Sequence, residues 1–153
     1  MGEALLSSGE LEQYLHRQIP LAEVMGVRVL GVSLAAVTLC APLEPNINHH
    51  ETVFGGAATS VALLAGWSLL YLRLQAAGIA HRLVIQRHSM EHERPITATF
   101  LARAQLSPQA QWPQFAAMLA RRAKARIGVS VRLEQSGERV AALLGEFVAL
   151  APR

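Results

Sequence analysis

Residues 42–72, PLEPNINHHETVFGGAATSVALLAGWSLLYL, decide the fold of this chain. Turn-forming residues lead to the pair Gly55-Gly56, and no charged residue follows until Arg73. Helix formers dominate after the glycines, and the run is too long for one strand. Because this helix is apolar on nearly every face, we expect other elements to bury it.

The residues just ahead of this helix are polar. They include Asn46, Asn48, His49, His50, Glu51 and Thr52. Unpaired backbone N–H groups and the positive end of the helix dipole point toward that place, which favours a developing negative charge. We therefore expect the chemistry at a polar, anion-stabilising mouth ahead of a hydrophobic helix.

Length and composition favour one globular domain over residues 1–153. The single Cys40 cannot form an internal disulfide, and the acidic start lacks a signal-peptide core, so we expect a cytoplasmic location. Residues 56–72 form an uncharged run of 17. That run is shorter than the roughly 20 residues of a membrane span, so we expect no membrane insertion.

The formal charge is +3, with a local basic run at Arg121, Arg122, Lys124 and Arg126. Such a run attracts an acidic partner or a phosphate-bearing cofactor, although a merely solvated face explains it equally well. Aromatic residues are scarce and no nucleic-acid-binding motif is present, so we expect no nucleic acid partner.

Around the central helix, the patterns predict short helices and six strands. Helical segments are expected at residues 8–18, capped by Ser8 or Gly9, at 21–25 and at 112–123; strands are expected at 27–34, 36–41, 83–93, 96–106, 125–134 and 139–150. Gly78 is the expected stop of the central helix. One sheet curled around one buried helix satisfies all the apolar faces, which gives an α+β domain.

Residues 45–56, PNINHHETVFGG, carry a resemblance to a known family. An Asn a few residues ahead of a Gly-Gly pair that opens a long helix resembles the hotdog-fold acyl-thioester enzymes. The turn at Glu93-Arg94-Pro95-Ile96 is similar to the strand junction of that family. More narrowly, the stretch resembles the thioesterase-like domain found fused behind a bacterial acetyltransferase, a branch that includes malonyl-acyl carrier protein decarboxylases. The resemblance implies a hotdog fold, and a homodimer with sheets joined edge to edge, with tetramers left open.

One departure from the family pattern bears on the reaction. Many hotdog hydrolases have His before Gly-Gly, where this chain has Phe54, and they carry an acidic residue on the central helix, where residues 55–75 have none. Hydrolysis needs a base in reach, whereas decarboxylation of a malonyl thioester needs mainly donors that stabilise an enolate oxygen. The missing carboxylate therefore favours decarboxylation.

Each polar residue receives an expected role in that reaction. Asn46 or Asn48, with the backbone N–H of Gly55 or Gly56, would hold the thioester oxygen, and Thr52 would bind the carboxylate or the departing group. The expected substrate-binding residues are His49, Phe54, Thr59, Arg82, Arg87, Arg121, Arg122 and Lys124. Asparagine is also common in turns for its local backbone bonds, and Thr59 can bond within its helix.

Metal and cofactor sites are not expected. His49 and His50 are adjacent and point apart, while His88 and His92 on a strand would lie about 13 Å apart.

Three functions stay open at this point. The first is decarboxylation of malonyl-acyl carrier protein or malonyl-coenzyme A to the acetyl thioester, which would feed the initiation of fatty acid synthesis. The second is an acyl-coenzyme A or acyl-carrier thioesterase that uses Glu51 or a partner-chain group as base. The third is a catalytically silent acyl-thioester binding domain.

Overall fold

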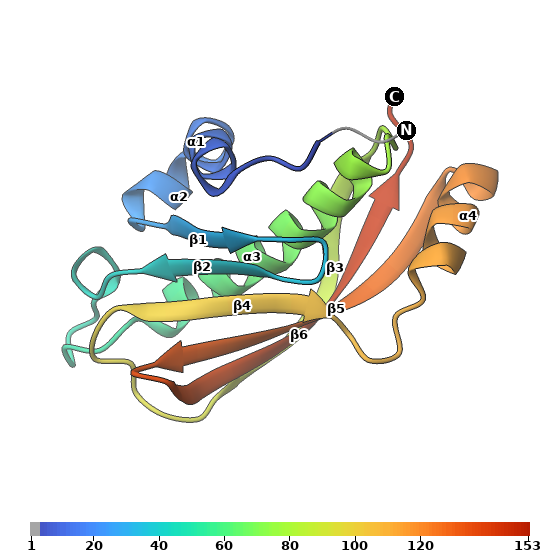
Figure 1. Cartoon of the computed structure of the whole chain (residues 1–153). Helices are drawn as coiled ribbons and strands as arrows, with labels where there is room; N and C mark the ends of the chain where they lie inside the picture. Colours follow the sequence, from blue (N-terminus) through green and yellow to red (C-terminus); the bar gives the residue numbers. More distant parts are fainter. Residues whose placement is uncertain (1–3) are drawn as a thin grey trace.

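The computed structural model describes residues 4–153. In chain order its elements are α1 (Ser8–Gln18), α2 (Pro20–Val24), β1 (Arg28–Val32), β2 (Val37–Ala41), the 3₁₀ turn η1 (Glu44–Asn46), α3 (Gly55–Ala76), β3 (Arg82–His92), β4 (Phe100–Leu106), α4 (Trp112–Arg122), β5 (Lys124–Gln135) and β6 (Glu138–Leu150) (Figure 1).

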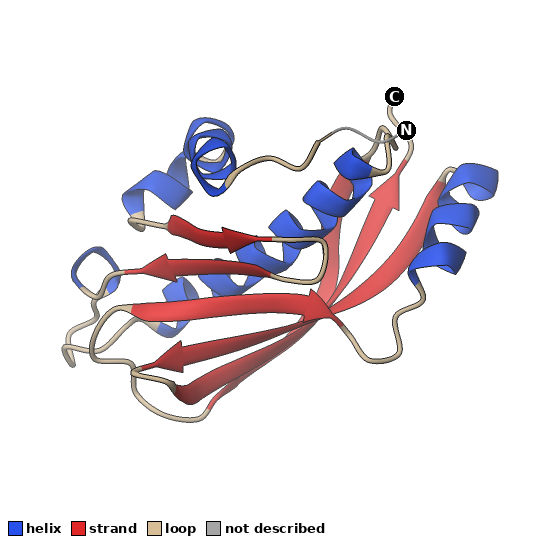
Figure 2. Ribbon diagram, viewed as in Figure 1, coloured by secondary structure: helices blue, strands red, loops and turns tan. Residues whose placement is uncertain are grey.

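The six strands form one antiparallel sheet in the order β1-β2-β4-β5-β6-β3. The sheet curls around α3, while α1 and α2 lie beside the β1 edge and α4 packs against β5 (Figure 2). The predicted α+β architecture, a sheet of about six strands around a long central helix, is confirmed.

The helix α3 is covered on almost all sides, as its composition predicts. Four leucines in its second half are fully buried: Leu69, Leu70, Leu72 and Leu74. Gly66 lets the sheet approach closely, because a Cβ at that residue would lie 2.8 Å from Cγ2 of Val129 and 3.3 Å from Cε1 of Phe147.

The helix also has the length and hydropathy of a membrane span, and 61% of its most apolar window is buried inside the fold. Packing against the curled sheet thus accounts for its apolar composition.

The end of α3 and the start of α1 lie close to their predicted positions. Gly78, with φ +70°, ends α3 as predicted, and its N–H donates to the carbonyl of Gln75. The cap of α1 is Ser7 rather than Ser8 or Gly9, because Ser7 and Glu10 form a reciprocal capping box.

The strand expected at residues 96–106 begins only at Phe100. The N–H groups of Thr97 and Ala98 donate to Oε1 of Gln135, and the Ile96 carbonyl accepts from the Val53 N–H. Because these backbone groups do not pair with a neighbouring strand, residues 96–99 form a loop. The bond between Ile96 and Val53 connects this loop to the segment that precedes α3.

The two edges of the sheet differ. At the β1 edge, Oε1 of Glu12 accepts the Val29 N–H at 2.9 Å, and the His16 ring bonds the Val27 carbonyl at 2.6 Å, so α1 covers that edge. The β3 edge pairs only with β6 among the described residues. Ten of the eleven residues of β3 are at least partly exposed. An open, long strand of this kind is a template for pairing with another chain.

Candidate active site at the N-terminus of the central helix

The first two N–H groups of α3 are free of protein partners. Its N-cap is Phe54, which provides no side-chain bond, and the Ala57 and Ala58 N–H groups both donate to the Phe54 carbonyl. Within residues 4–153, no hydrogen-bond acceptor lies on the N–H of Gly55 or Gly56. Two adjacent donors at the positive end of a 22-residue helix can hold an oxyanion.

The loop ahead of these donors is fixed by backbone bonds. The Phe54 N–H donates to the Asn46 carbonyl at 2.7 Å, and the Val53 N–H donates to the Ile96 carbonyl at 2.8 Å. These bonds tie the helix start to both flanking segments, so the donors do not need to reorganise when charge develops.

The amide of Asn46 is used inside the protein. Asn46 is 4% exposed, and its Nδ2 donates to the carbonyls of Met25 and Pro42 at 2.9 and 2.8 Å. Both amide hydrogens are therefore used in tying η1 to the end of α2 at Met25 and to the end of β2 at Pro42. The expected role of Asn46 toward the thioester oxygen stays a prediction, and these bonds give it a structural role.

Asn48 shapes the turn that carries Thr52. Its Oδ1 accepts from the N–H groups of His50 and Thr52, while its Nδ2 donates to Oγ1 of Thr52 at 3.0 Å. One amide hydrogen of Asn48 remains for a substrate. Glu51, with φ +64°, sits at the exposed tip of the turn.

One cleft, of about 550 Å³, opens beside Gly56. It is lined by Leu21, Val24, Met25, Pro45, Asn46, Ile47, Asn48, His49, Phe54, Gly56, Ala57 and Ser60. The Phe54 ring packs on Gly56, where a Cβ would lie 2.5 Å from ring atom Cε2. The structure thus brings Asn48, His49 and Phe54 together with the free N–H of Gly56. Thr59 does not line this cleft, and its hydroxyl donates to the Gly55 carbonyl at 2.9 Å within the helix.

A second cleft, of about 350 Å³, opens on the other side, beside Gly55. Its lining is Thr52, Val53, Gly55, Ala58, His92, Glu93, Arg94, Pro95, Ile96 and Ala141. A Cβ at Gly55 would lie 3.5 Å from Cε1 and 3.8 Å from Nε2 of His92, so the imidazole lies against the first turn of the helix.

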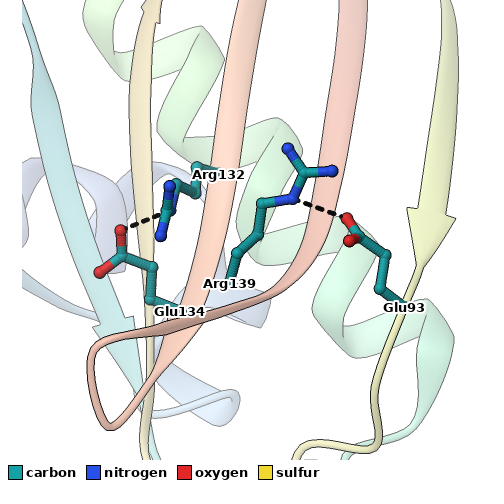
Figure 3. A network of polar contacts seen from close by, with 4 residues as sticks. All are labelled: Glu93, Arg132, Glu134 and Arg139. Atoms are coloured by element: carbon teal, nitrogen blue, oxygen red, sulfur yellow. Dashed lines mark hydrogen bonds and ion pairs between the residues drawn. The ribbon is translucent and has the colours of Figure 1, made fainter.

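Glu93 brings a carboxylate to this second cleft. Its Oε1 accepts from Nε of Arg139 at 2.8 Å across the end of the sheet (Figure 3). An acidic side chain therefore stands near the helix start, although none lies on α3. The sequence predicts His92 in a strand and Glu93 at a turn, with no site role for either. The two residues follow Gly55 by 37 and 38 positions, so no local pattern predicts that they lie close to it. Only the return of β3 along α3 brings them to the start of α3.

The basic residues expected to bind substrate lie elsewhere on the protomer. Arg122 and Lys124 line a groove of about 1110 Å³ between α4 and β5, and Arg121 is in the last turn of α4. The α4 helix lies near the far end of α3, where Arg73 stacks 4.4 Å over the Trp112 ring. Eighteen helical residues from Gly55 to Arg73 span roughly 27 Å.

Arg82 and Arg87 lie on β3. Arg82 begins the strand, at its far end from His92, and Arg87 faces Glu146 at 4.0 Å. One protomer therefore does not bring the five basic residues to the mouth.

Two perturbed groups lie outside the site. Burial raises the pKa of the Cys40 thiol. Burial also lowers the pKa of Arg73, whose Nη1 donates to the Leu34 carbonyl. Among residues 4–153, no cluster of three His, Cys, Asp or Glu side chains could hold a metal ion.

A six-stranded antiparallel sheet curled around one long helix, with a Gly-Gly start at an open mouth, defines a hotdog-fold protein. The chain belongs to the YiiD_C family, described as "Putative thioesterase (yiiD_Cterm)", whose model matches residues 8–151.

Solved structures share this fold. A protein of unknown function from Chlorobaculum tepidum is 24% identical, with a TM-score of 0.87 over 98% of this chain and 100% of the other. A structure described as a "putative thioesterase" from Shewanella oneidensis is 25% identical, with a TM-score of 0.79 over 95% and 97%. A thioesterase from Haemophilus influenzae is 12% identical, with a TM-score of 0.75 over 98% and 94%.

The hydrogen bonds of Asn46 generate a stability prediction. Asn46→Ala leaves the Met25 and Pro42 carbonyls without their donors, so we expect it to lower the free energy of unfolding by about 1–3 kcal/mol in urea denaturation. Asn48→Ala, in a more exposed turn, serves as the control and should cost less. If Asn46→Ala instead abolished activity without a change in stability, Asn46 would be assigned to the oxyanion site.

Proposed function

We propose that the protein hydrolyses an acyl thioester of coenzyme A or of an acyl carrier protein. The observation that carries this proposal is the pair of free N–H groups on Gly55 and Gly56, which lie between one cleft with apolar walls and another that holds His92. Membership of a thioesterase-like family and likeness to thioesterase structures support the same reaction class.

The geometry suggests how the reaction would run. The carbonyl oxygen would accept from the Gly55 and Gly56 N–H groups, with the acyl group in the cleft beside Gly56. The His92 imidazole would take a proton from water as the water oxygen attacks the carbonyl carbon. The tetrahedral oxyanion would then collapse, breaking the carbon–sulfur bond. The leaving sulfur would take the proton back from His92, giving a carboxylic acid and a thiol.

His92 is better placed than Glu93 to act as this base. The Glu93 carboxylate is engaged by Arg139, whereas the His92 ring has no hydrogen-bond partner among the described residues. Glu93 and Arg139 instead hold the end of β3 against β6, which positions the neighbouring imidazole.

Decarboxylation of a malonyl thioester is the second candidate. The absence of any carboxylate on α3 favours it, because the same N–H pair would stabilise an enolate oxygen without a base. We place it second because His92 and Glu93 reach the helix start from β3.

Incubation with pantetheine thioesters separates the candidates. Hydrolysis of butyryl- or dodecanoyl-pantetheine releases free thiol, whereas decarboxylation of malonyl-pantetheine releases carbon dioxide and leaves acetyl-pantetheine intact. Free thiol is the expected result. Carbon dioxide release without thiol would overturn hydrolysis in favour of decarboxylation, and no change in any thioester would leave only a binding domain.

The base assignment predicts the effect of replacing His92. His92→Gln should lower kcat for thioester hydrolysis by about 10²–10⁴-fold, the usual contribution of a general base. The matched control is His88→Gln, which changes the same residue type on the same face of β3 and lines neither cleft. Equal losses in both variants, or full activity in His92→Gln, would contradict the assignment.

We further propose that two protomers join through the open β3 edges. Antiparallel pairing of two β3 strands would bring the Arg82 end of one strand beside the His92 end of the other, and so bring basic side chains to each mouth. Those side chains suit the phosphates of coenzyme A or the acidic surface of a carrier protein.

This arrangement predicts a dimer in solution. Light scattering should give about twice the 16.6 kDa chain mass. Ser89→Pro, in the middle of β3, removes a backbone donor and should shift the mass toward one chain, since proline weakens strand pairing. Ser33→Pro in the loop after β1 is the comparison. A monomeric parent protein would refute edge pairing.

A further inference from the structure

The cleft beside Gly56 continues along α3 into an apolar groove. A neighbouring cleft of about 240 Å³ is lined by Ile19, Leu21, Met25, Ser60, Leu63, Leu64, Trp67, Ile85 and Phe147. The two clefts share Leu21, Met25 and Ser60 and so adjoin one another; together they are called here the α3 groove.

The lining of the α3 groove beyond the mouth is apolar apart from Ser60. The Ser60 hydroxyl donates to the Gly56 carbonyl at 2.8 Å, so it is already satisfied within the helix. Leu21 and Val24 on α2 flank the groove and are 54% and 67% exposed. Exposed apolar side chains of this size indicate a surface that another apolar group covers.

The length of the α3 groove follows from the helix. Gly56 and Trp67 are eleven residues apart, which corresponds to roughly 16 Å at 1.5 Å per residue. Carbon–carbon bonds of about 1.52 Å at tetrahedral angles advance an extended chain by about 1.3 Å per carbon. The groove therefore accommodates about 12 carbons between the helix mouth and the Trp67 ring.

Trp67 is held in place as the end of the groove. Its Nε1 donates to the Leu83 carbonyl at 3.2 Å, and its ring stacks on Tyr71 at 4.9 Å between centroids. A ring fixed by a hydrogen bond and a stacking partner is a rigid stop rather than a movable side chain.

We infer that the α3 groove binds the linear acyl chain of the substrate, with its carbonyl at Gly55 and Gly56 and its methyl end near Trp67. This inference rests on the proposed thioesterase function and names its substrate class as acyl thioesters of medium length, up to about 12 carbons. The occupant is an acyl chain because the groove is continuous with the mouth where the thioester carbonyl is placed. Each methylene buried there would tighten binding by up to about fourfold.

Fluorescence of Trp67 measures where the chain ends. In a Trp112→Phe protein, Trp67 is the sole tryptophan. Dodecanoic acid with bromine at carbons 11 and 12 should quench its emission saturably, whereas the isomer brominated at carbons 2 and 3 should bind with little quenching. The probe is an analogue of the carboxylic acid product and has no thioester bond to hydrolyse, so the readout does not depend on activity.

A block in the middle of the α3 groove gives the second measurement. Ser60→Phe should weaken binding of the brominated acid and lower the dodecanoyl-to-butyryl ratio of kcat/KM, each by at least tenfold. Gln75→Phe is the matched control, on the same helix and outside both clefts, and should leave that ratio unchanged.

The outcomes separate this inference from the proposed function. Position-dependent quenching without thiol release supports the groove and overturns hydrolysis. Thiol release combined with equal quenching from both isomers, or with no quenching from either, supports hydrolysis and overturns the assignment of the α3 groove to the acyl chain. Absent quenching together with a change of mass in Ser60→Phe would show that a second copy of the chain covers the groove, which also overturns the inference.

Discussion

The burial of α3 is the constraint on which the rest of this structure depends. A helix that is apolar on nearly every side must be covered on nearly every side, and one sheet can do this only by curling around it. The sheet comes close at Gly66, where Val129 and Phe147 leave no room for a Cβ. The helix is thereby fixed along its length and held with its first turn at the surface.

That first turn combines rigidity with unsatisfied donors. Most helices in proteins cap their first N–H groups with a side chain, whereas α3 begins with two glycines and leaves two N–H groups available. The loop is secured instead by backbone bonds from Val53 and Phe54 and by the buried amide of Asn46. One cleft opens beside Gly56 and another beside Gly55, so the available N–H groups border both.

The sequence predicts the fold closely, and it predicts part of the arrangement at the start of α3. Hydrophobic periodicity is a local property of the sequence. It therefore locates the helix at Gly55–Ala76, the stop of this helix at Gly78 and the six strands. The errors lie at element ends whose position is set by a helix cap or by hydrogen bonds of a loop. The grouping of polar residues around the start of the helix could also be predicted, because the glycines and polar residues are adjacent in the chain.

The individual roles were harder to predict. An asparagine that binds a substrate and one that braces a loop are alike in sequence, and only the bonds of Asn46 to Met25 and Pro42 distinguish them. His92 and Glu93 reach the helix start by the antiparallel return of β3, a tertiary relation that no local pattern encodes. The expectation of decarboxylation uses residues 55–75 alone, and so does not include His92 and Glu93, which line a cleft at the helix start from another element.

The amide resonances of Gly55 and Gly56 give the most direct test of the account's central claim, that these N–H groups hold the substrate carbonyl oxygen. The probe is an acyl-pantetheine analogue in which a methylene replaces sulfur, so that the carbonyl stays and hydrolysis cannot occur. In ¹⁵N-resolved NMR spectra, both amide protons should move downfield saturably with the analogue, while that of Gly66 stays in place. Saturable binding that leaves the Gly55 and Gly56 amides unshifted would contradict the account.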